Sequence, residues 1–253
     1  MTWRVVCASE VGTSHTYSGL PCQDSCLAQV DYLPNKQPLL FMFIADGAGS
    51  AVKGGEGAEL AIEAAATFMN KMVKQGEFGL NDQLATELVL TVRERIYAAA
   101  EAMQLTARDY ACTFIGVLSS PIGTLVMQVG DGGVVVDTGA GLEVAVVPMV
   151  GEYANMTHFV TDDDAVTVLE TKTYPDRALK VAAFTDGIQR LALNLASNTP
   201  HGPFFAPFFN GMANATAEQE DQLQGLLVKF LGSQAVNERT DDDKTLALAL
   251  WMH

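Results

Sequence analysis

The sequence predicts an α+β fold in which antiparallel sheets are covered by helices. Strand-like runs come first, two amphipathic helices follow as a pair, and further strands, a helix and a last strand complete the chain. This order lacks the regular strand–helix alternation of a doubly wound parallel sheet. The turns between the strands are short and rich in Gly and Pro, which favours antiparallel hairpins.

The N-terminal elements lead to one strongly apolar strand. Six mostly large apolar residues run into Ala45, and the loop Asp46–Ser50 (DGAGS) follows at once. A short apolar run closed by a Gly-rich turn is typical of a buried strand. A strand, a polar loop, a second strand and a hairpin turn are expected before it, at Trp3–Ser9, Gly12–Asp24, Cys26–Leu33 and Pro34–Pro38.

A helix pair follows, because apolar residues recur at three- and four-residue intervals. The first helix is expected over Gly57–Lys74, and Gly76 and Gly79 end it. Asn81 or Asp82 is a suitable cap for a second helix that continues to about Met103.

The chain then returns to strands, which we interpret as a meander of antiparallel hairpins. Gly130–Gly133, between two of these strands, taken alone is most simply a hairpin turn. The meander strands are expected at Cys112–Leu118, Thr124–Val129, Val134–Asp137 and Leu142–Val147.

The C-terminal part mixes all element types. A solvated loop is expected at Gly151–Asp164, and a Pro/Phe-rich irregular segment, a possible flap, at Thr199–Met212 within about 198–214. Strands are expected at Ala165–Thr171, Leu179–Phe184 and Thr245–Trp251, and helices at Ile188–Ala196 and Ala217–Gly232.

Composition excludes several classes of partner. The chain has 253 residues, 49% of them apolar and 18% charged, which permits a sizeable core. Its formal charge of −15 repels nucleic acid and anionic membranes, so we expect neither as a partner. The same charge attracts divalent cations, although acidity also serves solubility.

The four cysteines and the N-terminus indicate a cytoplasmic protein. Cys7, Cys22, Cys26 and Cys112 form no Cys-x-x-Cys pair, and we expect reduced, mostly buried thiols. The start MTWRVVCASEVG lacks a basic region followed by a long apolar run, so no signal peptide is indicated.

Aspartates recur where apolar strands begin or end. Any one Asp-Gly pair is also a common turn, but five such positions together are more specific. Hard cations such as Mg²⁺ or Mn²⁺ prefer carboxylate and carbonyl oxygens. A metal site is therefore expected from Asp24, Asp46, Asp131, Asp186 and the run Asp241–Asp243.

The motifs GTSHTYSGLPCQDS, FIADGAGS, QVGDGG, FTDGI and DDDKTLAL, in this order and spacing, resemble the metal-dependent protein serine/threonine phosphatases. This is the PPM or type 2C family, in its divergent bacterial branch. The resemblance spans about residues 3–250 and implies a single domain over 1–253. It also implies a four-layer α-β-β-α sandwich of two antiparallel sheets flanked by helices, with a two-metal site at one end.

The resemblance assigns the metal ligands residue by residue. It implies that Asp46 bridges two Mn²⁺ or Mg²⁺ ions, that Gly47 supplies its carbonyl, and that Asp186 holds one ion. Asp242 matches the aspartate of the family's Asp-Asn-x-Thr motif, with its neighbours Asp241 and Asp243 as alternatives.

Two further aspartates take secondary roles by the same resemblance. Asp24 matches an acidic residue that contacts metal through water. Asp131 matches a ligand of a third, weaker metal ion in some members.

The sequence departs from the family pattern around the phosphate. Gly19 stands where the family has a phosphate-binding arginine, and Ala48 stands where many eukaryotic members have a proposed acid histidine. Gly132 and Gly133 replace the Ser-Arg of Gly-Asp-Ser-Arg.

His15 is the natural substitute, either as a phosphate ligand or as a proton donor to the leaving alkoxide. A loop histidine bonded to backbone is an equally good interpretation. Lys53 is expected to be solvated rather than to steer phosphate, and Cys22 to serve packing, since no Cys-x5-Arg cradle follows it.

The resemblance implies a serine/threonine protein phosphatase that acts by attack of a metal-bridging water. Its partners are then phosphoserine and phosphothreonine proteins of signalling, including the substrates of a cognate kinase. The missing arginine motivates an alternative, a catalytically weak or inactive binding protein that keeps the fold. A nucleotide-binding protein is a further alternative, but the Gly-x4-Gly-Lys-Ser/Thr spacing is absent.

Overall fold

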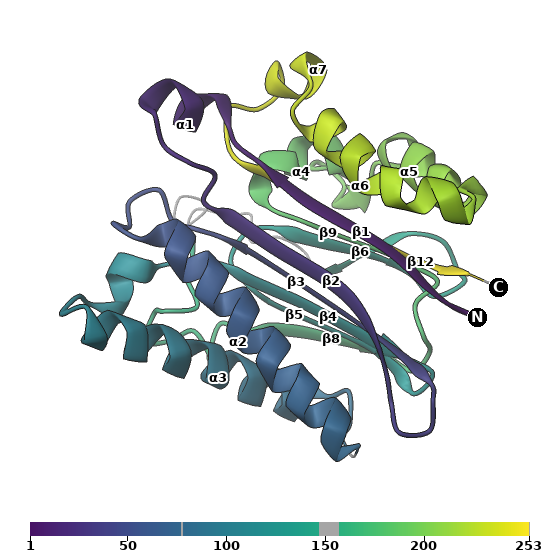
Figure 1. Cartoon of the computed structure of the whole chain (residues 1–253), viewed down its shortest axis with the longest axis horizontal. Helices are drawn as coiled ribbons and strands as arrows, with labels where there is room; N and C mark the ends of the chain where they lie inside the picture. Colours follow the sequence, from purple (N-terminus) through teal and green to yellow (C-terminus); the bar gives the residue numbers. More distant parts are fainter. Residues whose placement is uncertain (77, 147–156, 253) are drawn as a thin grey trace.

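The computed structural model describes residues 1–76, 78–146 and 157–252, and in them two five-stranded antiparallel sheets lie face to face between helices (Figure 1). The first sheet has the order β2 (Asp24–Tyr32), β3 (Pro38–Asp46), β4 (Phe114–Ser120), β5 (Gly123–Val129), β8 (Glu170–Tyr174). The second has the order β1 (Thr2–Glu10), β12 (Lys244–Met252), β9 (Lys180–Phe184), β6 (Gly133–Asp137), β7 (Glu143–Val146).

Helices cover the outer face of each sheet (Figure 1). The pair α2 (Gly54–Gln75) and α3 (Asp82–Ala102) lies on the first sheet, and α4 (Asp186–Ala192), α5 (Gly202–Asn214) and α6 (Ala217–Leu231) lie on the second. This arrangement confirms the expected four-layer α+β sandwich. The short helices are α1 (Thr13–Ser18), the 3-10 helix η1 (Ala107–Tyr110) and α7 (Gln234–Asn237). A small two-stranded sheet is formed by β10 (Leu193–Asn194) and β11 (Thr199–Pro200).

The continuous apolar run of β3 follows from burial of both its faces. Leu39, Phe41 and Phe43 pack in the core beneath α2 and α3. Leu40, Met42 and Ile44 point the other way, into the core between the two sheets. Side chains alternate across a strand, so a strand buried on both faces has no polar positions to alternate with.

Both long helices begin and end where the sequence predicts, within a few residues. Asn81 caps α3, since its side chain accepts a hydrogen bond from the Leu84 amide at 3.0 Å. Gly76 ends α2 in the left-handed conformation (φ 80°), which glycine adopts without strain. No helix among the described residues combines the length and apolar character that a membrane span requires.

The prediction of an irregular segment at Thr199–Met212 is wrong, because most of it forms α5. Pro203 lies in the first turn, where the missing N–H of proline costs little. Phe205, Phe209 and Met212 recur at helical spacing and are buried against the second sheet. The prolines suggested a break, but the aromatic periodicity determines the structure.

The prediction of a hairpin turn at Gly130–Gly133, taken alone, is also wrong. β5 belongs to the first sheet and β6 to the second, so this segment carries the chain from one sheet to the other. The meander is therefore two separate hairpins, β4–β5 and β6–β7. Gly130 has a φ of 116°, and a side chain there would meet Thr113, so glycine is required at this crossing.

Smaller differences concern local segments. The expected loop Gly12–Asp24 contains α1, and the strand expected at Ala165–Thr171 is mostly turns, with β8 beginning only at Glu170. Helix α4 ends at Ala192, short of the expected Ala196. Val147 and residues 151–156 of the expected loop lie outside the described residues.

Candidate metal centre

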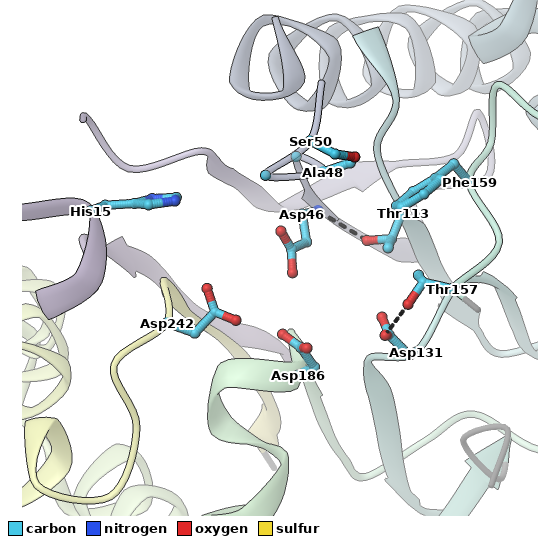
Figure 2. Close-up of a pocket in the computed structure, with 12 residues that line it drawn as sticks. His15, Asp46, Ala48, Ser50, Thr113, Asp131, Thr157, Phe159, Asp186 and Asp242 are labelled. Carbon is cyan, nitrogen blue, oxygen red and sulfur yellow. Dashed lines mark hydrogen bonds between the residues drawn. The ribbon is translucent and has the colours of Figure 1, made fainter. Parts of the chain in front are cut away.

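Four aspartates from four separate segments face one cavity (Figure 2). Asp46 ends β3, Asp131 lies between β5 and β6, Asp186 begins α4, and Asp242 precedes β12. The cavity has a volume of about 250 Å³. All four are among the aspartates that the sequence singles out as candidate metal ligands.

Asp46 is held in place by its own backbone. Its amide donates to the Thr113 hydroxyl at 3.0 Å, and its carbonyl accepts from the Thr113 amide at 2.8 Å. Gly47 also lines the cavity and lies against the start of α2, where an added Cβ would stand 2.4 Å from the Gly54 carbonyl carbon. Only glycine permits this close approach, which fixes the loop and leaves the Asp46 carboxylate directed into the cavity (Figure 2).

The three consecutive aspartates before β12 have different environments. Asp243 is buried and accepts hydrogen bonds from the Gly12 amide and the Gln23 amide, both at 2.6 Å. It therefore ties this loop to the N-terminal segment, while Asp242 is the member of the run that lines the cavity. Of the three alternatives that the sequence offered, the structure brings Asp242 to the site.

Asp131 is positioned by two glutamines and a threonine. The Gln128 side chain donates to the carbonyl oxygens of Gly130 and Gly132, and the Gln189 side chain donates to the carbonyl of Asp131 itself. The Thr157 hydroxyl donates to the Asp131 carboxylate at 2.6 Å (Figure 2).

Asp24 does not line the cavity but lies directly beside Asp46, which is its register partner across β2 and β3. Its Oδ2 accepts from the hydroxyls of Thr185 at 2.8 Å and Thr245 at 2.7 Å. Its Oδ1 is buried without a partner among the described residues. Burial raises the pKa of Asp24 to about 7, with the nearby charge of Asp243 adding to the effect.

Burial and mutual repulsion raise the pKa of the cavity aspartates as well. Desolvation and the charges of Asp24, Asp186 and Asp242 hold the pKa of Asp46 well above its usual range. Desolvation, Asp131 and Asp242 raise the pKa of Asp186 to about 6, and burial also raises the pKa of Asp242.

Among the described residues, little positive charge faces these carboxylates. No Lys or Arg is among the described residues that line the cavity, and Oδ1 of Asp186 is buried without a described partner. A cluster of oxygen donors with uncompensated negative charge fits a hard divalent cation.

His15 lies on α1 at the edge of the cavity and points toward Asp46 (Figure 2). Its Nδ1 lies 2.9 Å from the Asp243 carboxylate, so the ring is held by a side chain rather than by backbone. The side chain of Lys53 instead contacts both carboxylate oxygens of Glu56, at 2.6 and 2.7 Å.

The positions that depart from the family pattern carry no phosphate-binding group. Gly19 caps the C-terminus of α1 with a φ of 72°, and Ala48 lines the cavity with a methyl group. Burial raises the pKa of the Cys22 thiol, with Asp24 and Asp243 adding to the effect, so the thiol stays protonated.

Sequence reasoning missed Thr113, Thr157 and Phe159, which also line the cavity. None of them lies in an Asp-Gly motif. Thr113 is brought to Asp46 by the pairing of β3 with β4, and Thr157 and Phe159 belong to the segment between β7 and β8. The one available signal was the position of Thr113 at the start of a predicted strand.

A separate trio, His158, Asp162 and Asp164, has one ligand atom of each residue within 4.8 Å of the others. Asp162 already accepts a hydrogen bond from the Phe159 amide at 2.8 Å. We interpret these contacts as the internal bonding of this loop.

Comparisons with known proteins agree with this geometry. A family model described as "Protein phosphatase 2C" matches residues 11–231. The chain is 64% identical over 251 residues to "Serine/threonine-protein phosphatase 3" of Escherichia coli (strain K12), covering 99% of both chains.

Solved structures show the same fold at low sequence identity. The serine/threonine phosphatase Stp1 from Staphylococcus aureus has a TM-score of 0.58 at 14% identity, covering 100% of this chain and 96% of that one. The serine/threonine phosphatase of S. agalactiae has a TM-score of 0.60 at 13% identity, covering 99% and 100%.

Proposed function

The chain belongs to the protein phosphatase 2C family and is a serine/threonine protein phosphatase, and we propose that its acidic cavity is the metal-dependent active site. The observation that carries this proposal is the convergence of four aspartates from four segments on a cavity that no described Lys or Arg lines. We also propose that residues 1–253 act as a single domain. The pairing of β1 with β12 joins the two ends of the chain in one sheet and supports this.

The donor set favours Mn²⁺ or Mg²⁺. Both are hard cations that take carboxylate and carbonyl oxygens and retain waters. In this proposal Asp46 would hold two ions, and Asp131 would hold a third more weakly. The other proposed oxygen ligands of the ions are the Gly47 carbonyl, Asp186 and Asp242. Asp24 would contact an ion through a water molecule.

Bound ions supply two things, neutralisation of the phosphate charge and a lower pKa for a water molecule. Asp46 and its register partner Asp24 provide the negative charge that retains the ions. The two threonine hydroxyls that bond Asp24 fix its orientation behind Asp46.

His15 is the proposed catalytic side chain. Its Nδ1 is held by Asp243, which fixes the ring and leaves Nε2 for the substrate. In this position it protonates the departing serine or threonine oxygen or binds the phosphate. Gly19 and Ala48, which stand at the family's arginine and histidine positions, cannot fill these roles. The substrates are phosphoproteins, and we propose that they include those of a cognate serine/threonine kinase.

The test is hydrolysis of p-nitrophenyl phosphate and of a phosphothreonine peptide with Mn²⁺, by the wild type and by Asp46→Asn. We expect loss of activity by about three orders of magnitude, and the same loss with a chelator. Asp221→Asn, an exposed aspartate on α6, is the control and should keep wild-type activity.

Activity that survives both Asp46→Asn and chelation would overturn the metal-dependent site. Metal binding without turnover in the wild type would instead support the alternative, an inactive phosphatase-fold binding protein.

A further inference from the structure

A second cavity of about 340 Å³ lies outside the acidic cavity and is lined by residues of α2, of the C-terminal end of α3 and of η1. The two long helices α2 and α3 lie side by side (Figure 1). The floor of the cavity is apolar and includes Leu60 of α2 and Ala99 of α3, with Met103 58% exposed at its edge. We call this cavity the α2–α3 groove. It has room for one or two large apolar side chains.

Three glutamates of α2 form one rim of the α2–α3 groove. Glu56, Glu59 and Glu63 lie on one side of the helix, at intervals of three and four residues, and all are exposed. Glu56 is paired with Lys53. No Lys or Arg is among the described residues that line the groove, so Glu59 and Glu63 leave it with a net negative charge.

Short chain segments link the lining of the groove to the lining of the acidic cavity. Ser50 lines the acidic cavity, and α2 begins four residues later at Gly54 and carries Glu56 in its first turn. Tyr110 of η1 lines the groove, and the adjoining Ala111 carbonyl accepts a hydrogen bond from Ala48 in the active-site loop. A polypeptide bound with its phosphate at the cavity therefore has this surface beside it.

We propose that the α2–α3 groove docks a segment of the phosphoprotein substrate that carries lysine or arginine on either side of a large apolar residue. The apolar side chain enters over Leu60, and the basic side chains face Glu59 and Glu63. Charge complementarity argues for this occupant, since the rim is negative and the whole chain carries −15. This inference rests on the proposed phosphatase function.

The test uses peptides with one phosphothreonine and a Lys-Leu-Lys segment on its N-terminal or its C-terminal side. Matched peptides carry Glu-Leu-Glu in the same place. At low salt we expect the basic peptide of at least one orientation to have a KM about fivefold below that of its acidic counterpart. High salt should reduce this preference.

The variant Glu59→Lys/Glu63→Lys should remove the preference while p-nitrophenyl phosphate hydrolysis stays at the wild-type rate. The matched control Glu218→Lys/Asp221→Lys makes the same charge change at exposed positions on α6, over the other sheet, and should keep the preference. Equal KM values for basic and acidic peptides, or a preference that survives the α2 reversal, would overturn the proposal.

Binding of the unphosphorylated basic peptide, measured by fluorescence anisotropy, separates the two proposals. If the chain lacks phosphatase activity but binds this peptide and loses binding on Glu59→Lys/Glu63→Lys, the groove stands and the proposed function fails. If phosphatase activity is present and this peptide binds the wild type and Glu59→Lys/Glu63→Lys equally, the groove proposal fails while the proposed function stands.

Discussion

His15 brings a basic ring to a cavity that no described Lys or Arg lines, and its role is open to a sharp kinetic test. His15→Asn should lower kcat for phenyl phosphate about a hundredfold, because its phenolate leaving group needs a proton. p-Nitrophenolate leaves without one, so that substrate should lose much less. Asp243 still accepts from two backbone amides in this variant, so the fold should be retained.

Equal losses for the two substrates, together with weaker inhibition by inorganic phosphate, would contradict the acid role and favour phosphate binding. Lys53→Gln is the matched control. Since Lys53 is engaged by Glu56, its loss should change KM by no more than about twofold.

At the scale of elements, α5 contributes to stability through its buried aromatic face. Phe205 is fully buried and contacts the ring of Phe184 in β9, with centroids 6.3 Å apart. Phe205→Ala should lower the free energy of unfolding by about 3–5 kcal/mol. Phe208→Ala, a partly buried neighbour on the same helix, should cost clearly less. Urea unfolding measures both, and equal costs would mean that α5 is not held by this face.

The elements also show what the sequence could and could not predict. β3, α2 and α3 were predictable because burial of faces and helix caps are local signals, as the apolar run of β3 and Asn81 illustrate. α5 was not predictable from the sequence. Its prolines are local signals of a helix break, whereas the sheet against which its phenylalanines pack is distant in the sequence. Gly130 resembled a turn, and only the assignment of β5 and β6 to different sheets shows that it is a crossing.

The candidate site could be predicted from the sequence to a similar extent. Asp-Gly at strand ends indicated Asp46, Asp131 and Asp186, since a strand end is visible in the sequence. The different surroundings of Asp242 and Asp243 were not visible, because they depend on backbone amides more than two hundred residues away.

At the scale of the whole molecule, the buried carboxylates make metal-free stability depend on pH. The pKa values of Asp24 (about 7) and Asp186 (about 6) lie above the usual 3.8. Between pH 3.8 and about 6–7 the folded state binds more protons than the unfolded state, so the free energy of unfolding falls as pH rises. The stabilisation is fully present below pH 3.8 and is lost as pH rises through about 6–7.

Thermal unfolding in chelator should therefore give a lower Tm at about pH 8 than at about pH 5. Mn²⁺ should raise Tm more at the higher pH, where more carboxylates are ionised. Asp24→Asn should flatten the dependence in chelator, whereas a Tm that rises across this window would contradict the assignment.

The central claim is that the acidic cavity binds two divalent ions that share Asp46. Calorimetric titration of Mn²⁺ into the metal-free chain tests it most directly, with Asp46→Asn titrated in parallel. We expect two ions to bind the wild type, and Asp46→Asn to lose both or to bind them far more weakly. A wild type that binds no Mn²⁺, or an Asp46→Asn chain that binds two ions as tightly as the wild type, would contradict the claim.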